Sequence, residues 1–138
     1  MAFNDKFRAD IKRFKNKTNN KLDQYARAVV LEIDRRIVMK SPVDSGRFRA
    51  NWNVGSGYPD TNTTLDTDPS GSGAISKAQR ELQSININGQ IIYVTNSLPY
   101  SYKLEYQGWS MQAPQGMVRV TLAELSGILR SAAYEVKL

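Results

Sequence analysis

The sequence predicts an α+β fold with a long N-terminal helix, a small antiparallel sheet carrying an Asn-Gly hairpin, and a long C-terminal helix. Three observations predict it. Asn88-Gly89 lies between two apolar, strand-like runs. The remaining two are apolar stripes at helical spacing on either side of this region, made by Leu22, Tyr25, Ala26, Val29, Ile33 and Ile37, and by Met117, Thr121, Leu125, Ile128 and Ala132.

The N-terminal helix begins with an earlier stripe at Phe3, Phe7, Ile11 and Phe14. Thr18-Asn19-Asn20 follows, and such residues compete for backbone hydrogen bonds. The region is therefore either one long helix with a weak middle or two helices divided near Thr18. Pro42 disfavours helical backbone at Ser41, so we expect the helix to end there.

The segment from Ser41 to Trp52 carries turn chemistry followed by alternation. In Asp44-Ser45-Gly46 we expect the Asp44 carboxylate to bond its own backbone two residues on, and Gly46 to take a positive φ. From residue 47 the sequence alternates, which predicts a strand with one buried face. Phe48, Ala50 and Trp52 would face the core, and Arg47, Arg49 and Asn51 would face outward.

Residues 55–73 are rich in Gly, Ser, Thr and Asp. They predict a flexible loop or arm that could order against a neighbour. A short helix is expected over 74–82. Asn88-Gly89 then predicts a hairpin joining residues 85–87 to 90–94, within a sheet of three or four strands.

The C-terminal third is predicted to be helical. A short helix or turn over 99–106 would be stopped by Gly108 as a left-handed residue. Pro114 then leads into a helix over about 115–136. With 138 residues the chain is expected to form one domain, 1–138.

The composition excludes several classes of catalytic and metal-binding site. The chain has no cysteine and no histidine, which removes disulfides, thiolate nucleophiles and the usual general base. We therefore predict no catalytic residues, no metal site and no cofactor. Asp60, Asp66 and Asp68 are too loosely spaced for a calcium loop. The paired glycines at 55/57 and 71/73 lack phosphate-loop context.

Charge is distributed unevenly. Residues 1–52 contain 13 Lys/Arg and 6 Asp/Glu, a net +7, and residues 53–138 contain 6 and 7, a net −1. The excess is densest at Lys12, Arg13, Lys15 and Lys17. It indicates either a face turned toward nucleic acid or an acidic partner, or an ordinary solvated helix surface. The sequence offers neither a signal peptide nor a membrane span, so we expect the chain to be made and kept in a cytoplasm.

Three segments together resemble the tail-completion, or head–tail joining, proteins of tailed bacteriophages. Ser41-Pro42-Val43-Asp44-Ser45-Gly46-Arg47-Phe48-Arg49, followed by Asn51-Trp52, is similar to the family's first block. The second is Asn96 with Pro99-Tyr100, then Leu104-Glu105-Tyr106-Gln107-Gly108, where Gln107 is an insertion. The third is Ala113-Pro114-Gln115-Gly116-Met117. The loop at 55–73 is longer and more polar than the family pattern.

The resemblance implies a non-enzymatic virion protein located at the neck or tail. It implies a homo-oligomeric ring, expected to be hexameric, that contacts a head connector or adaptor and a tail terminator or tail-tube protein. Membranes are not implied as partners. The basic residues would contact either an acidic neighbouring subunit or, without sequence specificity, the DNA in the lumen; the candidates are Lys12, Arg13, Lys15, Lys17, Arg47 and Arg49.

The motif residues are expected to be architectural: Pro42, Asp44, Gly46, Trp52, Pro99, Tyr100, Gly108 and Pro114. Other functions stay open at this point. One is a tail terminator that caps the tube. A free-standing DNA-binding protein would need basic residues mixed with exposed aromatics. A carboxylate hydrolase would need two carboxylates in one cleft, and the acidic residues here are scattered.

Overall fold

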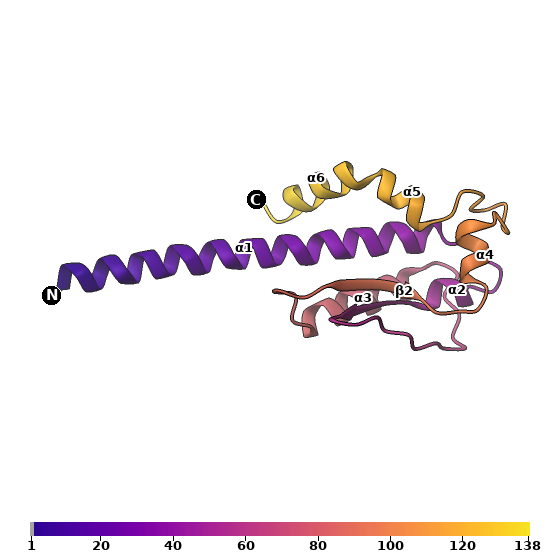
Figure 1. Cartoon of the computed structure of the whole chain (residues 1–138), viewed down its shortest axis with the longest axis horizontal. Helices are drawn as coiled ribbons and strands as arrows, with labels where there is room; N and C mark the ends of the chain where they lie inside the picture. Colours follow the sequence, from indigo (N-terminus) through magenta and orange to yellow (C-terminus); the bar gives the residue numbers. More distant parts are fainter. Residues whose placement is uncertain (1) are drawn as a thin grey trace.

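A single helix, α1 (Ala2–Lys40), runs the length of the molecule, and the rest of the chain packs around its C-terminal half (Figure 1). The computed structural model describes residues 2–138, apart from the side chains of residues 2–4, 14, 15, 17 and 18. Of the two possibilities for the N-terminal region, one continuous helix is correct. Figure 1 shows the sheet and α3 on one side of α1, with α5 and α6 on the other.

After α1 the chain turns through residues 41–46 into α2 (Arg47–Ala50) and then β1 (Trp52–Ser56). The expected strand over 47–52 is therefore wrong in its first half, since residues 47–50 form one helical turn. Phe48 and Trp52 are nevertheless buried, as predicted. Four residues apart, they share a face in a helical turn as well as in a strand.

The remaining elements are α3 (Ser72–Ser84), β2 (Ile92–Asn96), α4 (Ser101–Tyr106), α5 (Val118–Ala123) and α6 (Leu125–Glu135). The short helices predicted near 74–82 and 99–106 are confirmed. The C-terminal helical region is present too, divided at Glu124 into α5 and α6.

The sheet is antiparallel, as expected, but it pairs β1 with β2, with Trp52 opposite Asn96 and Ser56 opposite Ile92. Within the described chain it has two strands rather than three or four. Asn88-Gly89 forms a turn with Gly89 at φ +69°. The predicted hairpin pairing is wrong, because residues 85–87 are not a strand and Ile87 instead lies in the core.

Two groups of apolar side chains form the core. The larger joins the end of α1 to α2, β1, α4 and the approach to α5, through Val38, Phe48, Trp52, Leu104 and Met117. The smaller lies between β1 and α3, through Val54, Ala78 and Leu82, against residues of α1. Apolar burial of this kind supplies most of the free energy that stabilises a small domain. Among the described helices, none is both long and apolar enough to cross a membrane.

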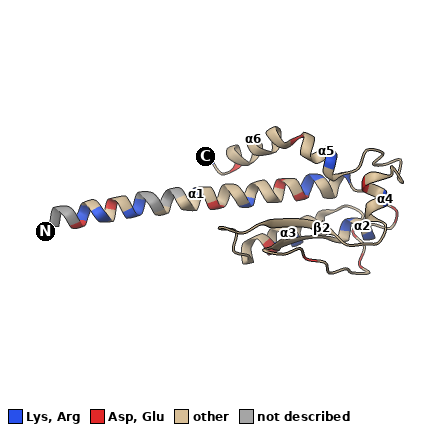
Figure 2. Ribbon diagram, in the orientation of Figure 1, with Lys and Arg blue, Asp and Glu red and all other residues tan. Residues whose placement is uncertain are grey.

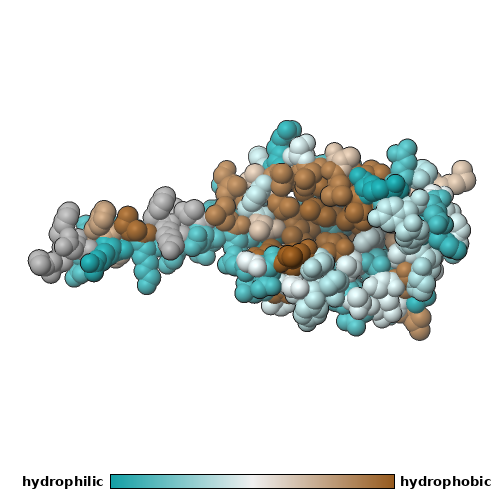
Figure 3. Space-filling view, in the orientation of Figure 1, coloured by the Kyte–Doolittle hydropathy of each residue, from teal (hydrophilic) through white to brown (hydrophobic). Residues whose placement is uncertain are grey.

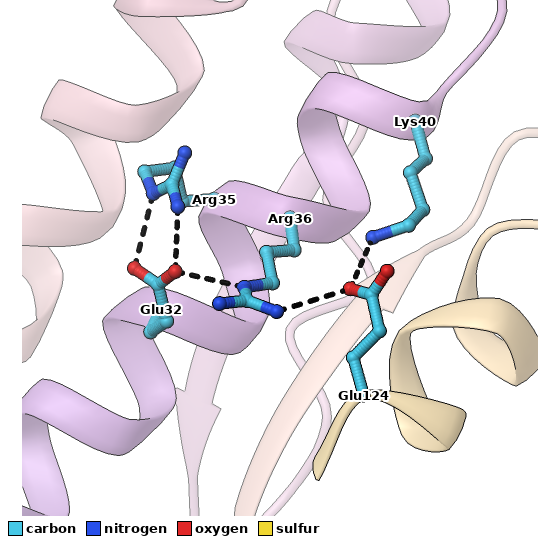
Figure 4. Close-up of polar contacts among 5 residues, drawn as sticks. All are labelled: Glu32, Arg35, Arg36, Lys40 and Glu124. Atoms are coloured by element: carbon cyan, nitrogen blue, oxygen red, sulfur yellow. Dashed lines mark hydrogen bonds and ion pairs between the residues drawn. The ribbon is translucent and has the colours of Figure 1, made fainter. Parts of the chain in front are cut away.

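An ion-pair network fixes α1 to the junction of α5 and α6 (Figure 4). Glu124 accepts hydrogen bonds from Arg36 Nη1 at 3.2 Å and Lys40 Nζ at 2.8 Å. Glu32 holds Arg36 from one turn earlier, at 2.8 Å, and also binds Arg35. The hydrogen bond from Lys40 lowers the pKa of Glu124. Linked pairs of this kind set the position of the C-terminal helices along α1 more than they add stability.

Candidate functional site

The three sequence segments that carry the family resemblance meet at the C-terminal end of α1. We call this region the joint; it comprises residues 41–52, 96–108 and 113–117. Phe48 and Trp52 pack edge to face with ring centroids 5.7 Å apart, and Phe48 lies 5.9 Å from Tyr100. The Asn96 side chain donates to Phe48 O at 2.9 Å, so the second segment is bonded directly to the first.

A hydrogen bond between Ser41 and Trp52 joins the two ends of the first segment. Ser41 is fully buried; its hydroxyl donates to Ile37 O and accepts from Trp52 Nε1, both at 2.8 Å. A buried indole N–H needs such an acceptor. Trp52 therefore anchors the start of β1 to the last turn of α1, as expected for an architectural residue.

Gly46 makes the chain reversal possible. Its φ is +93°, a conformation that residues with a Cβ rarely adopt. Its carbonyl oxygen accepts from both Ala50 N at 3.2 Å and Asp68 N at 2.9 Å. A Cβ at this position would lie 2.7 Å from the carbonyl carbon of Asp68, so the space is closed as well.

Asp44 does not make the turn bond expected of it. The side chain is exposed, and among the described residues it has no hydrogen-bond partner. The bond to the backbone two residues on comes from Ser45 instead, whose hydroxyl accepts from Arg47 N at 3.2 Å. The expected bond from the Asp44 carboxylate to the backbone two residues on is therefore wrong.

Arg47, Arg49 and Asn51 were expected to face outward, and this is wrong: Asn51 is buried, the two arginines are half-buried, and all three bind carbonyl groups of their own chain. Arg49 donates to Ser41 O at 3.0 Å, Met39 O at 3.1 Å and Pro69 O at 2.8 Å. The Met39 carbonyl lies in the last turn of α1 and that of Ser41 directly follows the helix, where no further helical donors are present. Arg47 Nε donates to Thr64 O at 3.2 Å.

Glu105 connects the second segment to the third, a role that the sequence did not reveal. Its buried carboxylate accepts from the backbone N–H groups of Met117, Val118 and Arg119 at 3.0, 2.8 and 3.2 Å. It therefore caps α5 from a different helix. Burial opposes ionisation, but the bonds from Val118, Met117 and Arg119 outweigh it and lower the pKa of Glu105.

Arg119 and Gly116 complete this contact. The Arg119 guanidinium binds both the Glu105 carboxylate and its backbone carbonyl oxygen. Gly116, at φ +89°, allows the chain to pass so close to α4 that a Cβ would lie 2.6 Å from Glu105 O. Gly108 follows α4 at φ +58°, which confirms its predicted left-handed conformation.

The acidic loop, residues 57–71, lies on the body of the protein through the joint and β1. Asn51 clamps Thr64 with two bonds, accepting from Thr64 N at 2.8 Å and donating to Thr64 O at 3.1 Å. Asn53 donates to Asn62 O at 2.7 Å. The predicted ordering of this segment against a neighbour stays a prediction, and these bonds define the surface that it presents.

Asp34 is a buried acidic residue outside the joint that was not predicted from the sequence. It lies on the buried face of α1 beside Ile37 and Val38, is 1% exposed, and neither carboxylate oxygen has a hydrogen-bond partner in the described chain. Burial raises the pKa of Asp34 to about 7, with a further contribution from Glu81 that Lys77 opposes. A carboxyl group within the apolar stripe of α1 was the available signal.

The basic residues of the N-terminal half lie toward both ends of α1 and in α2, so only some of them, such as Arg47 and Arg49, belong to the joint (Figure 2). Lys12 and Arg13 are exposed on α1, and Arg13 pairs with Asp10 in the same helix. The side chains of Lys15 and Lys17 lie outside the described residues. Comparison of the chain with protein-family models, with curated proteins and with solved structures finds no match.

Proposed function

We propose that this protein is a structural component of a tailed-bacteriophage virion that forms a ring at the neck and joins the head connector to the tail. The proposal begins from the resemblance of three separate segments to tail-completion proteins. Its main support is that these segments contact one another in one joint, with hydrogen bonds that link Asn96 to Phe48, 48 residues apart, and Met117 to Glu105, 12 residues apart. Residues that recur together for an architectural reason are expected to meet in this way.

The chemistry of the joint also supports an architectural role. Its conspicuous polar residues, Ser41, Arg49 and Glu105, are used up in bonds to backbone groups and to Trp52. An active site would instead aim such groups at a cleft. In this proposal the protein catalyses no reaction and needs no cofactor, and the joint serves to hold α1 rigidly against the sheet.

The proposal assigns DNA a passive part. Exposed cations of α1 that are not used between subunits would contact phosphates without reading bases, as suits a lumen through which any sequence passes. Arg47 and Arg49 are less suited to this task because their guanidinium groups already bind carbonyls in the joint.

Deletion of the gene from its phage genome tests the proposal. Lysates should contain DNA-filled heads and separate tails of normal length, and a plasmid copy of the gene should restore joined particles. Electron microscopy of negatively stained lysates provides the measurement. Joined, infectious particles without the protein would contradict the proposal, and tails of irregular length would favour a tail terminator instead.

A further inference from the structure

The N-terminal part of α1, which we call the arm (residues 5–20), projects beyond the body of the protein (Figures 1 and 3). Its described side chains are all exposed. Among described residues, the first side chain of α1 to bond another element is Lys21, which donates to Val136 O at 2.9 Å. At 1.5 Å per residue the arm is roughly 24 Å long. A solitary helix of this length is only marginally stable in water.

The arm carries apolar side chains with nothing to cover them. Phe7 is 60% exposed and Ile11 is 53% exposed, and their spacing of four places them on one face of the helix. The arm is also basic: residues 5–20 contain six Lys/Arg and two Asp, a net charge of +4. Such a surface suits an acidic partner that also offers apolar groups.

The acidic loop is opposite to the arm in charge and also carries exposed apolar side chains. Residues 57–71 contain Asp60, Asp66 and Asp68 and no Lys or Arg, a net charge of −3. Tyr58 is 75% exposed and Leu65 is 83% exposed. Because Asn51 clamps the neighbouring Thr64, the loop is held in place and would lose little further entropy on binding.

We propose that the arm of one copy docks on the acidic loop of the next copy, with Phe7 and Ile11 against Tyr58 and Leu65. This rests on the proposed function, for which it supplies the contact between neighbouring subunits. The contact joins two different surfaces, so it is heterologous, and repeating it closes a ring when the rotation allows. Charge would select the partner and the orientation, while the apolar side chains would supply most of the affinity.

A charge exchange in the full-length protein tests the contact. Lys12→Glu and Asp66→Lys each place like charges across the proposed interface, and each should raise the dissociation constant about fivefold, equivalent to about 1 kcal/mol. The double variant restores opposite charges and should return within about twofold of wild type. Arg130→Glu, on the exposed face of α6, is the matched control and should have no effect.

Sedimentation velocity over a range of concentrations measures the association, and the helical circular dichroism signal checks that each variant is folded. Phe7→Ser should weaken association more than either charge variant, by at least about tenfold. A wild-type protein that stays monomeric, a double variant that is not rescued, or an Arg130→Glu effect equal to that of Lys12→Glu would overturn the proposal.

DNA is the alternative partner of the arm, and the same variants distinguish it from a second copy of the chain. If Lys12→Glu abolishes binding to duplex DNA and leaves self-association unchanged, the arm serves DNA and the proposed contact is overturned. A dissociation constant for self-association that is unchanged in Lys12→Glu would likewise overturn the contact. Neither result affects the deletion phenotype, so the failure of this inference is distinguishable from failure of the neck function.

Discussion

The two ends of α1 differ in how their side chains are used. At the C-terminal end Ile37, Val38 and Ser41 are buried, and Arg49 binds the last carbonyl groups of the helix. At the N-terminal end Phe7 and Ile11 are exposed. Contacts within the chain therefore account for the side chains at the C-terminal end of α1, but not for the exposed apolar side chains at its N-terminal end. The comparison teaches that the joint determines folding, whereas the arm is available for contacts between molecules.

The largest expected effect is at the joint. Gly46→Val should lower the free energy of unfolding by at least about 3 kcal/mol, since it combines a positive φ with a steric clash at the 68–69 backbone. Chemical denaturation measures it. Gly127→Ala is the control, because its Cβ would meet nothing within 4 Å, and it should raise stability by about 0.5–1 kcal/mol. Equal stabilities for the two variants would contradict the role of Gly46.

Glu105→Ala should cost about 2–3 kcal/mol, because three backbone donors and Arg119 lose their acceptor. Glu105→Gln keeps one oxygen acceptor and should lose less. Since the pKa of Glu105 is lowered in the folded state, its contribution is present above the ordinary carboxyl pKa of 4.5 and is lost as pH falls through the folded value. Urea unfolding at pH 7 and pH 3 compares wild type with both variants. A Glu105→Ala protein as stable as wild type at pH 7 would remove the capping argument.

Asp34→Asn should stabilise the protein at pH 8. The pKa of Asp34 rises from 3.8 to about 7 on folding, so the folded state retains a proton that the unfolded chain has lost, and stability falls as pH rises between these values. The shift corresponds to about 4 kcal/mol. A buried amide keeps part of the desolvation cost, which leaves a gain of about 2 kcal/mol.

Unfolding of Asp34→Asn at pH 4 and pH 8, beside the exposed control Asp66→Asn, tests this expectation. The gain should be lost at pH 4, because Asp34 is protonated in the folded state and is already partly protonated in the unfolded chain, where its pKa is 3.8. A gain that is independent of pH, or one that Asp66→Asn shares, would show that the Asp34 carboxyl is not the cause.

The smallest effect on stability is expected in the arm. Phe7→Ser combined with Ile11→Ser should change the unfolding free energy of the monomer by less than about 0.5 kcal/mol, because both side chains are exposed in the single chain. Thermal and urea unfolding of dilute protein measure it. A loss of 2 kcal/mol or more would mean that the arm belongs to the folding unit, and the contrast with the joint would disappear.

The sequence predicted the elements whose signal is local. The stripe from Leu22 to Ile37 gave the helix, and the glycines at 46 and 108 gave the chain reversals. It did not predict the strand pairing, because the partner of β2 is β1, about 40 residues upstream, and not the segment across Asn88-Gly89. The local turn signal was correct, but a pairing across 40 residues depends on the whole core.

The sequence predicted which residues make up the candidate site better than it predicted the hydrogen bonds that they form. The motif residues do meet, yet Ser45 takes the place expected of Asp44, and Arg47 and Arg49 turn inward because residues 47–50 are helical. Glu105 could not be assigned from sequence, since its partners are backbone N–H groups of another element. Almost every residue has a backbone N–H group, so no residue pattern in the sequence marks the partners of Glu105.

Hydrogen exchange at low and high protein concentration tests the central contrast most directly. In dilute protein the amides of residues 5–20 should exchange quickly, while those of residues 36–40 and of β1 are protected. At a concentration where the protein associates, the arm and the acidic loop should both become protected and the joint should stay unchanged. Protection of the arm that is equal at both concentrations, or new protection confined to the joint, would contradict the account.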